Sequence, residues 1–236
     1  MPFNLLEQVT LHRERDALII SFPRPVPILS WAVLNGGFCY ASHLVNHHVN
    51  SDDAGFGGNP EGWLSREMQR LELQGKAVVM ATGVTMSELI EVSFSDGARE
   101  VACFATAGYG NALSVGDAAS FQDSQVISPH TINMIFLVQP SLREEAMVEA
   151  VQIATEGRVR ALYESGIRST QSSLPATGTG TDCIALASIG SSVERYCGKH
   201  TKLGELIGLA AYTAIAKGLA KASAAGVKLG GNSDVQ

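Results

Sequence analysis

The feature that most constrains this chain is segment 176–182, which reads Ala-Thr-Gly-Thr-Gly-Thr-Asp and precedes the apolar run 183–187. Glycine lets the backbone adopt positive φ and lets another group approach closely, while a threonine hydroxyl both donates and accepts hydrogen bonds. We therefore predict a polar loop that leads into a buried strand and holds an anion or an amide through backbone N–H groups. The plainer alternative is a tight turn that is capped by Asp182.

The length of the chain, 236 residues, favours a single domain, which we place at residues 1–229, followed by a disordered tail at 230–236. The formal net charge of −6 and the lack of a Lys/Arg cluster argue against a nucleic-acid partner. The composition therefore favours a single globular domain with a hydrophobic core and without a nucleic-acid partner.

Compartment and membrane association are inferred from two further features. The N-terminus lacks a basic or apolar leader segment, and the apolar run 206–216 is shorter than a bilayer span requires. The scattered cysteines contain no C-x-x-C pair, which is typical of buried thiols in a reducing compartment. We therefore expect a cytoplasmic protein without a membrane partner. The cysteines are Cys39, Cys103, Cys183 and Cys197.

Hydrophobic periodicity predicts a chain that begins with strands and gains its longer helices late. This pattern indicates an α+β fold, a layered α/β domain with one large mostly antiparallel or mixed sheet and about three main helices. The expected strands are 5–12, 17–22, 28–34, 38–45, 77–81, 88–94, 101–105, 134–138 and 183–187, with a hairpin turn at 95–97. The expected helices are 60–74 behind the N-cap Asn59, 141–164 behind a Ser141/Glu144 capping box, and 202–225.

Three of the predicted strand ends carry small polar and glycine residues, at 35–37, 106–111 and 177–182. Ligands gather where strand ends converge on open loops, so we expect these segments to line one cleft. Near Ser30, the segment 35–37 reads Asn-Gly-Gly, which places a carboxamide beside backbone N–H groups and suits a carbonyl or an oxyanion. A plain turn is the alternative for this segment.

Histidines and one helical carboxylate are candidates for proton transfer. His43 and His47 share a strand face and His48 points away, and two imidazoles without a near third ligand make a weak zinc site. We therefore expect no metal and favour a histidine as general acid or base, with His130 as a further candidate. Glu156 lies within a predicted helix. If its carboxylate faces inward, we expect a raised pKa, and if it faces outward, it is an ordinary surface residue without a functional role.

Six segments, taken in order, resemble the adenosylcobinamide amidohydrolase family of cobamide salvage enzymes. They cover most of the chain from about residue 28 to 215, and the run at 176–182 is the most distinctive. The chain departs from the family pattern at Gly157-Arg158, where that pattern looks more like Ala-Lys. The matching segments are 30–37, 106–112, 131–133, 155–158, 176–182 and 201–208.

The resemblance implies hydrolysis of the amide bond that joins the corrin-ring propionate to the aminopropanol arm of adenosylcobinamide. The product would be adenosylcobyric acid, for corrinoid salvage and remodelling, and complete cobamides such as pseudocobalamin are a second substrate class. The partner would be the corrinoid itself. No cofactor is expected, because the substrate carries the cobalt, and the oligomeric state stays open, a homo-oligomer included.

Amide hydrolysis needs a base or a nucleophile, an oxyanion site and an acid for the leaving amine. We expect a carboxylate as the base and a histidine as the acid, with a threonine nucleophile as the alternative mechanism. The predicted catalytic residues are Asp182, Glu156, His47, His130, Thr177 and Thr179. The predicted substrate-binding residues are Ser30, Asn35, Gly36, Gly37, Thr106, Asn111, Asn133, Gly178, Gly180 and Thr181.

Two other functions compete with this interpretation. One is a corrinoid or nucleotide binding module without catalysis. The other is a metal-dependent amidase that would use His43 and His47.

Overall fold

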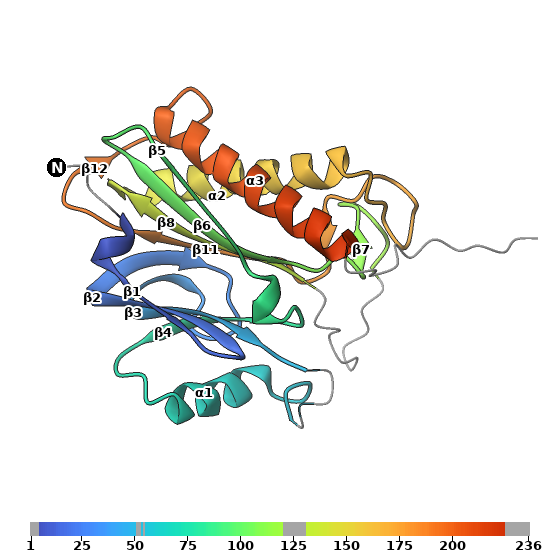
Figure 1. The fold of residues 1–236 in the computed structure, drawn as a ribbon, viewed down its shortest axis with the longest axis horizontal. Helices are drawn as coiled ribbons and strands as arrows, with labels where there is room; N and C mark the ends of the chain where they lie inside the picture. Colours follow the sequence, from blue (N-terminus) through green and yellow to red (C-terminus); the bar gives the residue numbers. More distant parts are fainter. Residues whose placement is uncertain (1–4, 51–52, 54, 120–130, 225–236) are drawn as a thin grey trace, which may run out of the picture.

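The computed structural model describes residues 5–50, 53, 55–119 and 131–224, which form four layers (Figure 1). Helix α1 (Pro60–Arg70) covers one outer face of the molecule, and α2 (Glu144–Glu164) and α3 (Lys202–Ala224) cover the other. Two stacked halves of a single sheet lie between these helices. The predicted fold class, an α+β domain with a large mixed sheet and three main helices, is confirmed.

The main sheet has eight strands in the order β4-β3-β2-β11-β8-β6-β5, with β1 paired to β2 off this path. The β3–β4 and β8–β11 pairs are parallel, and the other pairs are antiparallel. The strands are β1 (Thr10–Arg13), β2 (Ala17–Ser30), β3 (Gly37–His48), β4 (Ala77–Thr82), β5 (Ile90–Ser95), β6 (Glu100–Ala107), β8 (Ile132–Gln139) and β11 (Cys183–Ser188). The short elements are η1 (Leu5–Gln8), η2 (Met86–Glu88), β7 (Ala112–Leu113), β9 (Ser141–Leu142), β10 (Gly178–Thr179) and β12 (Val193–Glu194).

Strand β2 belongs to both halves of the sheet. Its pairing with β3 shifts in register between Ser21 and Val26, and residues 28–30 pair with β11 on the other side. We predicted separate strands at 17–22 and 28–34, but the prolines between them lie within one long bent strand. They are tolerated because an irregular stretch does not need every backbone N–H in the ladder.

Three hydrophobic cores separate the four layers. The inner core lies between the halves of the sheet and includes Leu44, Phe104 and Ile135. A second core packs α2 and α3 on the upper half, and a third packs Leu64 and Met68 of α1 on the lower half. Helix α3 alone among the described residues is long and apolar enough to cross a membrane, but 56% of that window is buried inside the fold.

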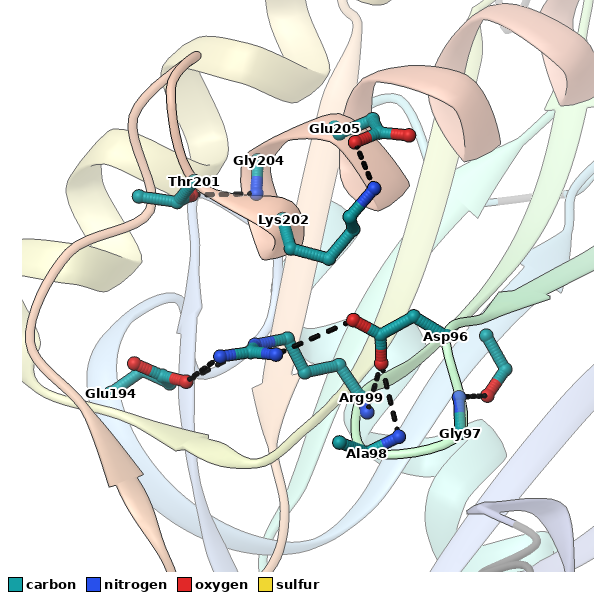
Figure 2. A network of polar contacts seen from close by, with 10 residues as sticks. Asp96, Gly97, Ala98, Arg99, Glu194, Thr201, Lys202, Gly204 and Glu205 are labelled. Carbon is teal, nitrogen blue, oxygen red and sulfur yellow. Dashed lines mark hydrogen bonds and ion pairs between the residues drawn. The ribbon is translucent and has the colours of Figure 1, made fainter.

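The predicted hairpin at 95–97 is confirmed as the turn between β5 and β6, and Figure 2 shows how it is held. The Asp96 carboxylate accepts hydrogen bonds from the backbone N–H groups of Ala98 and Arg99 at 3.0 and 2.7 Å. These bonds hold the pKa of Asp96 below its ordinary value. The Arg99 guanidinium then reaches Glu194 in β12 at 2.9 Å, which ties this hairpin to the chain that leads into α3.

Helix boundaries were predicted with mixed success. Asn59 caps α1 as expected, since its Oδ1 accepts from Gly62 N at 2.9 Å, but α1 ends at Arg70 rather than at 74.

The predicted capping box at Ser141 is wrong, because α2 begins after Arg143 without a side-chain cap. Ser141 instead lies in β9, where its hydroxyl donates to the carbonyl of Gly190 at 2.9 Å. The predicted tail at 230–236 lies outside the described residues.

Close packing of α2 on α3 depends on Gly157. A Cβ added there would lie 2.8 Å from Ala211 Cβ and 3.0 Å from the carbonyl oxygen of Gly208. We expect Gly157→Ala to lower the free energy of unfolding by about 1–3 kcal/mol, because the helices must move apart. Urea-induced unfolding followed by circular dichroism measures this change.

Gly208→Ala is the matched control, since its added Cβ would lie at an ordinary 3.5 Å from Ile153 Cγ2. Alanine is the better helix former by about 1 kcal/mol, so this variant should be neutral or stabilised. Equal losses in both variants would contradict the close-packing interpretation.

Candidate active site

The inner core changes from apolar to polar at one end of the sheet. Asn46, Thr82, Thr106 and Asn133 continue the inward-facing positions of β3, β4, β6 and β8, and each is at most 1% exposed. Asn133 Nδ2 donates to Asn46 Oδ1 at 2.8 Å, and Asn46 Nδ2 donates to Thr106 Oγ1 at 3.1 Å. Thr106 Oγ1 in turn lies 3.4 Å from Thr82 Oγ1. This chain of hydrogen bonds joins the two halves of the sheet.

Next to this polar cluster, Asp182 accepts hydrogen bonds on both carboxylate oxygens. Oδ2 accepts from Thr179 N at 2.9 Å and pairs with the Arg158 guanidinium at 2.9 Å. Oδ1 accepts from Ile132 N at 3.1 Å and from the hydroxyl of Thr179. The side chains of Asp182 and Arg158 are only 8% and 11% exposed, so this ion pair is largely shielded from water.

The loop itself is anchored from several elements. Trp31 Nε1 donates to the carbonyl of Asp182 at 2.6 Å, and the Thr131 hydroxyl donates to the carbonyl of Thr181 at 2.7 Å. Thr177 Oγ1 accepts from Val115 N at 2.8 Å, and β10 pairs with β7. The predicted polar loop leading into a buried strand is therefore present, with Asp182 at its base.

This geometry offers a hydroxyl that is already bonded to a carboxylate. Thr179 is partly exposed, and the neighbouring Gly180 is exposed. Asn111 lies beside Gly180, and its buried Oδ1 has no hydrogen-bond partner among the described residues. A hydroxyl, a carboxylate and a free carboxamide oxygen are groups that amide chemistry can use.

The thiol of Cys183 follows Asp182 directly but does not join this group. It is buried, and its Sγ lies 3.6 Å from Ser30 Oγ. Burial raises the pKa of Cys183 to about 11, so the thiol stays protonated at neutral pH.

Two of the three polar strand ends meet, since Asn111 lies beside Gly180 and β7 pairs with β10, whereas the third bonds elsewhere. Ser30 is buried, donates to the carbonyl of Ile184 at 2.9 Å and accepts from Ala32 N at 3.0 Å. The side chain of Asn35 donates to the carbonyl of Ala77 at 2.8 Å. These two predicted binding residues are thus engaged in holding the backbone.

The glycines after Asn35 are explained by the turn. Gly37 has φ of 97°, which favours glycine, and a Cβ at Gly36 would lie 2.6 Å from the carbonyl oxygen of Ala32. Both are exposed. The plain-turn interpretation accounts for this segment.

The structure does not bring Glu156 to this site. Residues two apart on a helix point about 200° apart, so Glu156 faces away from its neighbour Arg158. Its carboxylate is bonded to Lys199 at 2.6 Å. This bond, together with one from Gln152, holds the pKa of Glu156 below its ordinary value, which corrects the expected raised pKa.

The histidines also lie elsewhere. The ring of His47 faces α1, where it packs edge-on against Trp63 with ring centroids 5.4 Å apart and has Glu67 at 3.7 Å. His43 bonds Ser21 Oγ at 2.8 Å instead of approaching His47. Within the described part of the chain, no group of three His, Cys, Asp or Glu side chains could hold a metal. His130 lies outside the described residues.

Two residues of the candidate site were not predicted from the sequence. Arg158, which forms the ion pair with Asp182, stood out only as a departure from the family pattern. Trp31 lies in the matching segment 30–37, but the bond that its indole donates to the loop was not predicted. A buried arginine needs an acidic partner, but its burial is not visible in the sequence.

Comparison with known proteins gives the family. The model of the adenosylcobinamide amidohydrolase family matches residues 2–226, which is nearly the whole chain. The chain belongs to this family. This membership supports a hydrolase and confirms the resemblance that was seen in segment 176–182 and its companions.

This amidohydrolase-family protein also shows distant similarity to three individual proteins. It is 28% identical over 226 residues to "Uncharacterized protein MJ1613" of Methanocaldococcus jannaschii, covering 88% of this chain and 87% of that one. Among solved structures, a Burkholderia sp. beta-aminopeptidase has a TM-score of 0.48 at 14% identity, covering 89% and 82% of the two chains. The PH0078 protein of Pyrococcus horikoshii OT3 has a TM-score of 0.46 at 12% identity, covering 90% and 83%.

The two glycines of the loop differ sharply in their surroundings. A Cβ on Gly178 would lie 2.2 Å from Asp182 Oδ2, whereas one on Gly180 would lie 3.6 Å from Leu113 Cδ1. We expect Gly178→Ala to displace the carboxylate and lower the free energy of unfolding by about 1–3 kcal/mol. Gly180→Ala should stay within about 0.5 kcal/mol of wild type. Chemical denaturation compares them, and a larger loss in Gly180→Ala would contradict this geometry.

His47 should make stability depend on pH. Burial of the ring holds the pKa of His47 below its ordinary value, so the unfolded state binds the proton more readily. The contribution of neutral His47 is therefore fully present above about pH 6.5 and falls as pH drops below that value. We expect the free energy of unfolding to fall less steeply between pH 7.5 and 5.5 in His47→Phe than in wild type, as measured by urea titration. Identical slopes would contradict this assignment.

Proposed function

We propose that this protein hydrolyses the amide bond between the corrin-ring propionate and the aminopropanol arm of adenosylcobinamide, giving adenosylcobyric acid. The observation that carries this proposal is the Thr179 hydroxyl, which donates to the Asp182 carboxylate in the most distinctive segment of an amidohydrolase family. Complete cobamides with the same amide are candidate substrates as well. A role in cytoplasmic corrinoid salvage belongs to the same proposal.

In the proposed reaction, Thr179 Oγ attacks the amide carbon while its proton passes to Asp182. The proton then goes to the departing aminopropanol nitrogen, and the C–N bond breaks. Water hydrolyses the resulting ester, which returns a proton to Thr179 and releases the carboxylic acid. A water molecule held by the same hydroxyl and carboxylate would be the attacking group in a direct hydrolysis.

The surrounding residues supply the remaining requirements. Arg158 balances the charge of Asp182 and fixes its orientation toward Thr179. The free Oδ1 of Asn111 is an acceptor for an N–H of the substrate. A corrin ring bears mostly neutral carboxamides, and the threonine, asparagine and glycine residues of this loop are suited to such a ligand. The cobalt belongs to the substrate, so the proposal needs no further cofactor.

A corrinoid-binding role without catalysis is the second candidate. The observation that favours it is the saturation of Asp182, which accepts bonds from Thr179, Ile132 and Arg158. A carboxylate whose two oxygens already accept this many bonds is a good anchor for a loop.

Incubation with adenosylcobinamide, followed by chromatography for adenosylcobyric acid, tests the proposal. Thr179→Val keeps the shape of the side chain but removes the hydroxyl, and we expect it to lower kcat by about 10³-fold or more. Thr177→Val is the matched control, since the Thr177 hydroxyl accepts from Val115 N rather than bonding to Asp182, and it should retain most activity.

The outcomes separate the candidates. Turnover that depends on Thr179 but not on Thr177 supports the amidase. Corrinoid binding without release of cobyric acid in wild type supports the binding module. Full activity of Thr179→Val would contradict a catalytic role for the Thr179 hydroxyl.

A further inference from the structure

Three exposed aromatic side chains lie where β2 ends and β3 begins, and one of them bonds to the loop that carries Thr179. Trp31, Phe38 and Tyr40 are 50%, 42% and 61% exposed, and we call these three the aromatic strip. They are three of the five aromatic side chains that are exposed among the described residues, the others being Tyr163 and Tyr196. Large apolar side chains normally leave water, so a cluster of them on the surface indicates a binding site.

The aromatic strip lies on one continuous piece of backbone. Phe38 and Tyr40 are two residues apart on β3 and therefore share a face, and their rings meet edge-on with centroids 6.2 Å apart. Gly37 pairs with Ser30, the residue before Trp31, and Tyr40 pairs with Pro27. The strip thus runs for about 10 Å along β2, since each strand residue advances about 3.3 Å.

The two ends of the strip reach different features. At one end, Trp31 Nε1 donates to the carbonyl of Asp182, so the indole lies against the loop that carries Thr179. At the other end, Tyr40 lines a cavity of about 970 Å³, whose other lining residues include Pro25, Pro27 and several serines. The strip therefore joins the candidate active site to open space large enough for a bulky ligand.

We propose that the aromatic strip is the docking surface for the flat face of the corrin ring. This inference rests on the function proposed above. The adenosyl group covers one face of the ring in adenosylcobinamide, so the opposite face is the one that lies on the strip. The neutral, apolar character of Trp31, Phe38 and Tyr40 suits a macrocycle, and continuity through Trp31 brings the amide-bearing arm toward Thr179.

Binding of adenosylcobinamide to single variants tests this docking surface. We expect Phe38→Ala and Tyr40→Ala each to raise Kd and KM about 10-fold, because each removes one stacked ring, while kcat stays near wild type. Neither side chain is among the bonding partners of Thr179 and Asp182 in the described residues, so a uniform loss of binding is the expected signature. Equilibrium dialysis in the Thr179→Val background, where turnover is slow, gives Kd, and steady-state kinetics gives kcat and KM.

Tyr163→Ala is the matched control, because Tyr163 is 67% exposed on α2 and lies outside the strip. Its Kd and KM should equal those of wild type. If wild type turns over adenosylcobinamide but Phe38→Ala and Tyr40→Ala behave like Tyr163→Ala, the docking surface is overturned and the amidase stands. If wild type neither binds nor hydrolyses any corrinoid, both the amidase and the docking surface are overturned.

Discussion

A single carboxylate holds the candidate active site together. Asp182 bonds to Thr179 within its own loop, to Ile132 at the start of β8 and to Arg158 on α2. A buried charge is tolerated only when it is paired and hydrogen-bonded, and removing one partner of such a pair costs about 3–5 kcal/mol. The loop, the sheet and the helix are therefore placed relative to one another by the same requirement.

Local signals account for the parts of the fold that could be predicted from the sequence. The turn at 95–97 and the cap at Asn59 involve residues that are close together in the chain. The continuation of β2 through its prolines could not be predicted in this way, because it depends on the pairing of residues 26–30 with β3 and of residues 28–30 with the distant strand β11. Ser141 fits a capping pattern locally, yet its hydroxyl bonds to Gly190, a residue that packing brings close.

The candidate site was predicted in part for a related reason. The glycine and threonine pattern at 177–182 is a property of the segment itself, so the loop could be found without a structure. The direction of a helical side chain depends on which face of α2 is buried, and this face turned out to carry Arg158 rather than Glu156. Likewise, His47 is inside the protein but on the side of the sheet that faces α1.

The shared strand β2 has a consequence for the order in which the protein can assemble. Residues 17–21 pair with β3, which follows within the next 30 residues, whereas residues 28–30 also need residues 185–187 of β11. During synthesis, the N-terminal half of the sheet can form early. One edge of β2, however, stays unpaired until about three quarters of the chain has been synthesised. Until then, the end of β2 presents an open strand edge, and the loop that carries Thr179 has not yet been made.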